Sequence, residues 1–145
     1  MTQVDFYILG DEPAEARLRI ACRIAEKAMQ LDQHVFIRSS SGGEARQLDE
    51  LLWTFAESSF VPHGIVGLAA ASPEPFEPVL IGVDAEPAGP RWDLLINLAE
   101  DVPEYFGRYA RVAEIVDSDP ARRRQGRERY KYYRDKGYKL LTHVV

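Results

Sequence analysis

The order of apolar segments constrains the fold of this 145-residue chain more than any other feature of its sequence. Short β-rich runs alternate with longer segments of helical periodicity, which is typical of parallel strands joined by crossover helices. We therefore expect an α/β fold, a single-domain Rossmann-like three-layer sandwich over residues 1–145 with a mostly parallel sheet of about five strands. The expected strands are residues 4–9, 34–38, 78–83, 92–98 and 109–116.

Helices are expected between these strands. Leu18, Cys22, Ala25 and Met29 share one apolar stripe, which predicts a helix over residues 13–31. Cys22 is then a core residue, because thiols buried in apolar surroundings are unreactive. A second helix holding several leucines follows the loop 39–43, and a short one lies near 103–108. Five prolines exclude regular helix over most of residues 71–91.

Composition narrows the class of protein. Hydrophobic residues make up 46% and charged residues 28% of the chain, as in globular proteins and unlike disordered ones. No 18-residue apolar window suggests a membrane span, and a single cysteine excludes an internal disulfide and a cysteine-cluster metal site. We expect a cytoplasmic protein without membrane contact.

Charge is divided unevenly along the chain. Residues 119–139 contain nine Lys or Arg and three Asp or Glu, a net charge of +6, so the rest carries −11 of the total of −5. An acidic body with one basic element indicates a local anionic ligand rather than a surface that coats nucleic acid. A solvated helix rich in arginine is the alternative.

The basic element is predicted to form a helix over residues 120–136. Asp119 is a suitable N-cap residue, Pro120 suits the first helical position and Gly137 suits the stop. At 100° per residue, four side chains fall on one face and a fifth lies at its border. These residues are Arg123, Arg127, Tyr130 and Arg134, with Lys131 at the border.

This face combines guanidinium groups with an aromatic ring. Guanidinium groups bind carboxylates bidentately, and a tyrosine ring offers a flat apolar wall. The pattern therefore favours a ligand that carries both carboxylates and an apolar side chain. Tyr130, Tyr132 and Tyr133 could instead pack on the sheet, and single-stranded nucleic acid also accepts interleaved arginines and aromatics.

Motifs for catalysis are missing from the sequence. The Gly-rich loop 39–43 lacks the Lys and Ser or Thr of a phosphate-binding loop, since Glu44 follows Gly43. His34, His63 and His143 have no metal-ligand spacing, and no nucleophile elbow occurs. We expect no enzymatic activity, no cofactor and no metal. The alternatives are a small nucleotide-binding α/β enzyme and a direct single-stranded nucleic-acid binder.

Five segments together resemble the chi subunit family of bacterial DNA polymerase III. They are FYIL, LDELLW at 48–53, SFVPH at 59–63, WDLLINL, and RERYKYYRDKGY, in order along nearly the whole chain. The resemblance implies a Rossmann-like, non-enzymatic accessory subunit of the clamp loader complex. It also implies a link to single-stranded DNA-binding protein, whose acidic C-terminal tail ends in an aromatic residue, so that DNA is contacted only indirectly.

The resemblance assigns tail binding to Arg127 and Tyr130 in RERY, with weaker support for Lys131, Arg134 and Arg123. Arg127 is expected to pair with the terminal carboxylate of the tail. Tyr130 is expected to wall the pocket for its aromatic ring.

A second surface, which binds the psi subunit and in some proteins a helicase-like repair partner, is implied for Trp53, Phe60, Val61, Pro62 and His63. A buried loop corner is the alternative interpretation of these apolar residues. The chain departs from the family pattern in the Ala- and Pro-rich residues 69–90, and in Arg122 and Arg124.

Overall fold

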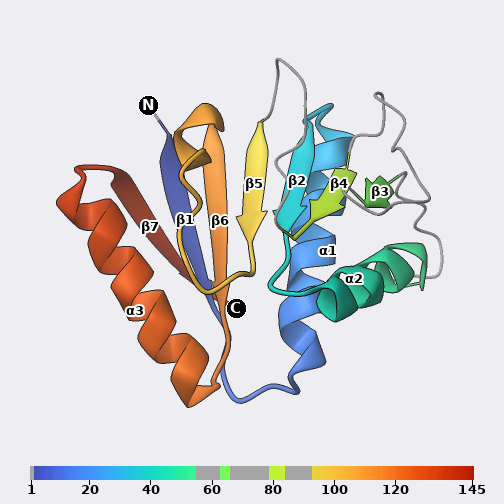
Figure 1. The fold of residues 1–145 in the computed structure, drawn as a ribbon, viewed down its shortest axis with the longest axis horizontal. Helices are drawn as coiled ribbons and strands as arrows, with labels where there is room; N and C mark the ends of the chain where they lie inside the picture. The colour runs from blue at the N-terminus through green and yellow to red at the C-terminus, as the bar shows by residue number, and fades with distance from the viewer. Residues whose placement is uncertain (1, 55–62, 66–78, 84–92) are drawn as a thin grey trace.

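A single parallel sheet organises the part of the chain that the computed structural model describes, residues 2–54, 63–65, 79–83 and 93–145. Seven strands lie in the order β3-β4-β2-β5-β6-β1-β7, and every neighbouring pair is parallel (Figure 1). The strands are β1 (Gln3–Ile8), β2 (Val35–Arg38), β3 (His63–Ile65), β4 (Val79–Gly82), β5 (Leu94–Asn97), β6 (Arg111–Val116) and β7 (Lys139–Val144). The helices are α1 (Glu15–Gln30), α2 (Gly42–Thr54) and α3 (Pro120–Asp135).

The predicted α/β class and parallel sheet are confirmed, and the seven strands of the described residues exceed the predicted number of about five. The two unpredicted strands, β3 and β7, lie at the two edges of the sheet. β3 has only three residues, too few for a periodic signal, and five of the six residues of β7 are exposed. Buried parallel strands are recognised by continuous apolar runs, which an exposed edge strand does not need. The helix expected near 103–108 is a single 3-10 turn, η1 (Phe106–Arg108).

Helices cover both faces of the sheet and produce three layers, as predicted. Leu18 and Cys22 of α1 and Leu48 of α2 belong to one hydrophobic cluster, which covers one face. Tyr133 of α3 and Phe106 of η1 belong to the other cluster, on the opposite face. In Figure 1, α3 lies beside β7, and α2 lies toward the other edge of the sheet.

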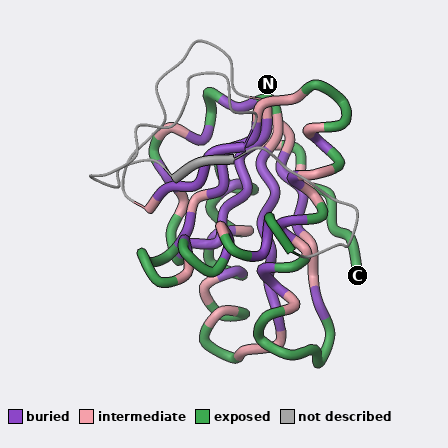
Figure 2. Tube along the Cα trace, turned by 90° about the vertical axis from the view of Figure 1, so that its right-hand side faces the viewer, coloured by how far each residue is buried: buried purple, intermediate pink, exposed green. Residues whose placement is uncertain are grey.

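Alternation along β1 assigns its side chains to the two faces. Val4 and Phe6 are buried in the cluster beneath α3, while Asp5 and Tyr7 point to the opposite face. The central strands β2, β4 and β5 are buried almost throughout, and Figure 2 shows the strands as a buried centre between more exposed segments. The core role predicted for Cys22 is confirmed, because its side chain is fully buried and burial raises the pKa of its thiol to about 12.

Among the described helices, none is long and apolar enough to cross a membrane.

Candidate functional site

Helix α3 begins and ends where the sequence predicts. The Asp119 side chain accepts a hydrogen bond from the backbone N–H of Arg122 at 3.0 Å, which caps the first turn. Pro120 occupies the first helical position, and Gly137 adopts a φ of +84°, a left-handed conformation that suits glycine. The start of the helix is also tied to the end of β6 by a bidentate pair between Arg122 and Asp117, at 2.8 and 2.7 Å.

A buried polar network fixes the rotation of α3 on the sheet. Glu114 of β6 is fully buried and accepts hydrogen bonds from Arg129 at 2.8 Å, Tyr133 at 2.7 Å and Asn97 at 2.9 Å. Burial raises the pKa of the Glu114 carboxyl, and the neighbouring Arg129 opposes that effect. Arg129 and Tyr133 are four positions apart and therefore lie on the same face of α3, so their shared contact with Glu114 sets which face of the helix meets the sheet.

An apolar groove lies between α3 and the carboxyl-terminal part of β1, β6 and β7, with a volume of about 270 Å³. Phe6, Ile8 and Val116 provide its floor, and Tyr130 packs edge-on against Phe6 with ring centroids 5.2 Å apart. The remaining lining residues are Arg123, Gly126, Arg127 and Thr142.

Gly126 allows α3 to approach the sheet closely at the groove. A Cβ atom at this position would lie 2.9 Å from Cγ2 and 3.3 Å from Cγ1 of Val116. Glycine in a helix interior costs about 1 kcal/mol relative to alanine. The close approach of helix and strand explains why a glycine stands at this position despite that cost.

The two arginines that line the groove differ in their partners. Arg123 donates to the backbone carbonyls of Asp117 at 3.1 Å and Leu9 at 3.3 Å, so its guanidinium is fixed at the end of the groove nearest the start of α3. Within the described residues, Arg127 has no hydrogen-bond or ion-pair partner, and its side chain is exposed. A guanidinium beside an apolar groove can pair with a ligand carboxylate while the groove holds an apolar side chain.

The structure thus brings together three of the five residues predicted for tail binding: Arg123, Arg127 and Tyr130 line one groove. Lys131 and Arg134 are exposed on α3 but do not line it. Of the three helix tyrosines, Tyr133 is fully buried, Tyr130 is partly buried and Tyr132 is 42% exposed.

Sequence reasoning missed Phe6, Ile8, Val116, Gly126 and Thr142. Four of them belong to strands and reach the groove only through the fold. Their strand alternation could have shown which face they occupy, but not that α3 leaves part of that face uncovered.

The second predicted surface is described only in part. Trp53, in the last turn of α2, is 48% exposed. Phe60, Val61 and Pro62 lie outside the described residues. His63 begins β3, and its side chain is likewise outside the described part of the chain.

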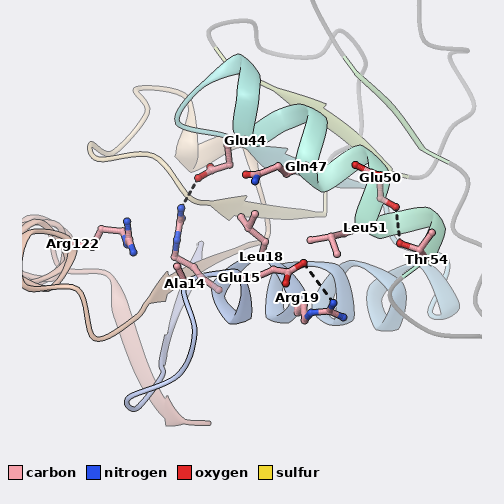
Figure 3. Close-up of a pocket in the computed structure, with 11 residues that line it drawn as sticks. Ala14, Glu15, Leu18, Arg19, Glu44, Gln47, Glu50, Leu51, Thr54 and Arg122 are labelled. Atoms are coloured by element: carbon pink, nitrogen blue, oxygen red, sulfur yellow. Dashed lines mark hydrogen bonds and ion pairs between the residues drawn. The ribbon is translucent and has the colours of Figure 1, made fainter.

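A larger and more polar pocket lies between α1 and α2, and Figure 3 shows its side chains. Arg17 pairs with Glu44, and Glu44 also accepts a hydrogen bond from the backbone N–H of Ser40 at 3.0 Å. Glu15 pairs with Arg19 at 3.5 Å. The carboxylate of Glu44 therefore occupies the loop at the start of α2, where a phosphate would lie in a nucleotide-binding relative of this fold.

The family model and the relatives that match this chain all carry the same description. The family described as "DNA polymerase III chi subunit, HolC" matches residues 1–141. The DNA polymerase III subunit chi of Pseudomonas aeruginosa is 38% identical, covering 99% of this chain and 96% of the relative. The subunits of the same name from Haemophilus influenzae and Escherichia coli are 34% and 30% identical, covering 97% and 98% of this chain and 95% and 97% of the relatives.

A crystal structure of T4 UvsW superposes with a TM-score of 0.71 at 8% identity, covering 99% of this chain and 41% of that protein. At this identity the similarity concerns the fold alone. It agrees with the parallel α/β architecture of the sheet.

Proposed function

The chain belongs to the DNA polymerase III chi subunit family, and from this premise we propose that it is a non-catalytic replication subunit that captures the acidic C-terminal tail of single-stranded DNA-binding protein. The tail binds in the groove beside α3. The same subunit connects the bound protein to the clamp loader complex, so that its contact with DNA is indirect. It acts in the bacterial cytoplasm as part of the replisome.

The position of Arg127 carries the proposal. Its exposed guanidinium lies at the rim of an apolar groove, and no described residue neutralises it. A terminal carboxylate can accept two parallel hydrogen bonds from such a group, a geometry that an ammonium cannot reproduce. The pairing directs the last side chain of the tail into the groove.

The size and lining of the groove suit one aromatic ring. An apolar cavity of about 150 Å³ is enough to hold benzene, and the groove has about 270 Å³. Phe6, Ile8 and Tyr130 offer apolar contacts to such a ring. Drug-sized or cofactor-sized ligands need roughly 300 Å³ or more, so a single side chain fits the groove better than a nucleotide does.

The first turns of α3 add attraction for the acidic residues that precede the end of the tail. Arg123 and Arg124 lie there beside Arg122, whose charge is already paired with Asp117, although cations at a helix N-terminus oppose the helix dipole. Exposed charge pairs contribute little individually and are screened by salt. We therefore expect salt-sensitive binding with a Kd on the order of micromolar.

The connection to the clamp loader is proposed for the surface at the end of α2. Trp53 is large, apolar and about half exposed, as an anchor residue at a protein interface would be. Phe60, Val61, Pro62 and His63 complete the proposed surface for the psi subunit. A helicase-like repair protein is a further proposed partner of this surface.

The proposed absence of catalysis is supported by the side chains at the carboxyl edge of the sheet. Parallel α/β folds bind nucleotides there, at the N-termini of the following helices. Here Glu44 places its own carboxylate on the Ser40 N–H and on Arg17, so a phosphate would meet a negative charge. This arrangement opposes the alternative of a nucleotide-binding enzyme.

The proposal is tested by calorimetric titration of the tail peptide of the host's single-stranded DNA-binding protein into the wild-type protein and the Arg127→Ala variant. We expect saturable 1:1 binding and a loss of at least about tenfold in affinity for the variant, since a charged hydrogen-bonded pair is removed. Arg46→Ala, which removes an exposed cation from α2, is the matched control and should bind as the wild type does. Absence of binding at low salt, or equal loss in both variants, would refute tail capture in this groove.

A further inference from the structure

A second groove, of about 280 Å³, lies on the face of the sheet opposite to α3. The C-terminal half of α1 passes there beside the amino-terminal parts of β5 and β6 and beside Tyr7 of β1. Its lining includes Tyr7, Arg23, Ile24, Lys27, Leu31 and Arg111.

Two of its cations lack a counter-charge. Arg23 and Lys27 are one helical turn apart, a spacing at which like charges destabilise a helix. Both are exposed, and within the described residues no carboxylate forms an ion pair with either. An anionic ligand would relieve this repulsion.

A third cation reaches the groove from the sheet and is held in position. Arg111 donates to the Asp5 carboxylate at 3.2 Å and to the Tyr7 hydroxyl at 3.4 Å. Asp5 is 1% exposed, so it anchors Arg111 from beneath the surface. The Arg111 side chain is itself 37% exposed and remains accessible to a ligand.

Apolar surface lies between these cations. Leu31, which follows the last residue of α1, is 64% exposed, and Ile24, about two turns earlier in the helix, is partly buried. The Tyr7 ring is stacked on His143 with centroids 4.9 Å apart, which keeps the ring in place on the groove wall. A single exposed leucine has no special meaning, but a leucine beside three cations forms a mixed apolar and cationic surface.

We propose that this groove binds an internal acidic segment of a partner protein, with one bulky apolar side chain flanked by carboxylates. The apolar side chain lies against Ile24, Leu31 and Tyr7. Carboxylates on its two sides pair with Arg23 and Lys27 on the helix and with Arg111 on the sheet. Since cations come from both the helix and the sheet, a segment with carboxylates on both sides of the apolar residue fits better than a chain end.

Charge supports a peptide rather than a nucleic acid as the ligand. The chain has a net charge of −5, which opposes a long phosphate backbone, and three cations neutralise only a few phosphates. The proposed surface lies across the sheet from the groove beside α3 and involves none of its residues. It therefore goes beyond the function proposed above and is independent of it.

The test uses the full chain labelled with nitrogen-15 and a peptide of two aspartates, leucine and two aspartates, acetylated at its N-terminus and amidated at its C-terminus. The amide removes the terminal carboxylate that the Arg127 groove requires, so failure here is distinguishable from failure of tail capture. We expect saturable shifts of backbone signals at Tyr7, Arg23, Lys27 and Arg111. Arg127→Ala should leave them unchanged.

The double variant Arg23→Glu with Lys27→Glu should weaken peptide binding by about tenfold or more. The matched control, Arg46→Glu with Lys136→Glu, changes the net charge equally at two other exposed positions and should retain binding. Equal weakening in both double variants would overturn the proposal, as would an absence of saturable shifts in the groove. Tighter binding of an oligothymidylate of about ten nucleotides at the same residues would also overturn it, by assigning the groove to nucleic acid.

Discussion

Replacing one partner of the buried Glu114–Arg129 pair should destabilise the protein strongly. Glu114 is 0% and Arg129 is 6% exposed, and three hydrogen-bond donors converge on the carboxylate. Glu114→Gln leaves a buried guanidinium without its counter-charge and places an amide NH2 among donors. Breaking such a pair costs about 3–5 kcal/mol. For a chain of this length, that corresponds to a fall in Tm of roughly 10 °C or more.

The pH dependence distinguishes the two halves of the pair. Burial raises the folded-state pKa of Glu114, and Arg129 opposes that effect, so Arg129→Met should raise it further. A carboxyl whose folded pKa is raised contributes stability below its unfolded pKa and loses it as the pH rises through the folded value. The cost of Arg129→Met is therefore largest at neutral pH and shrinks on acidification. The cost of Glu114→Gln does not shrink, because glutamine does not titrate while the wild type gains stability as Glu114 takes up its proton.

The assay is denaturant unfolding followed by circular dichroism at pH values between about 4.5 and 7.5, within the range where most proteins remain folded. Wild type, Glu114→Gln and Arg129→Met are compared at each pH, with Arg46→Met as an exposed control. Equal, pH-independent costs for the two variants would show that Glu114 is not ionised beneath α3. The account of how the helix is anchored would then be wrong.

Three further outcomes are expected. Gly126→Ala should weaken tail-peptide binding several-fold in calorimetry, because the added Cβ atom would lie 2.9 Å from Val116. Adding Val116→Ala should restore part of the affinity. An unchanged affinity in the single variant would contradict the close approach of helix and strand. Cys22, whose thiol pKa burial raises to about 12, should resist an alkylating reagent at neutral pH and react after denaturation, so rapid labelling of the folded chain would exclude the core position. Burial alone would raise the pKa of Asp117, but hydrogen bonds from Arg122 outweigh this effect and lower the pKa. Asp117→Asn should therefore reduce the free energy of unfolding by about 1 kcal/mol at neutral pH and by less as the pH falls through the folded-state pKa. A cost that does not decrease on acidification would exclude the ion pair.

Local signals in the sequence explain which elements of the fold could be predicted. Helix α3 was located to within about one residue, because Asp119, Pro120 and Gly137 mark its ends with side-chain and backbone preferences of their own. β7 was missed because most of its side chains are exposed, so its stability comes from pairing with β1 rather than from its own apolar pattern. The strand order likewise depends on packing between distant segments, which spacing along the chain does not encode.

In the candidate site too, residues placed by a local pattern could be predicted, and residues brought together only by the fold could not. Helical periodicity placed Arg127 and Tyr130 on one face, and the structure brings both to one groove. The floor residue Phe6 is more than one hundred positions away in sequence, and no local pattern connects it to α3. Arg129 looked like one more cation of the basic run, yet it is buried on Glu114. A buried acidic partner on another element cannot be identified from the helix sequence alone.

The most direct test of tail capture is a double-mutant cycle between Arg127 and the terminal carboxylate of the tail. Calorimetry would compare the tail peptide as a free acid and as a C-terminal amide, each with wild-type protein and with Arg127→Ala. If the two groups pair, the amide and the variant each weaken binding, and their combination adds little, with a coupling energy of about 1–3 kcal/mol. Additive losses, with a coupling energy near zero, would show that the carboxylate binds elsewhere and would contradict the proposed role of the α3 groove.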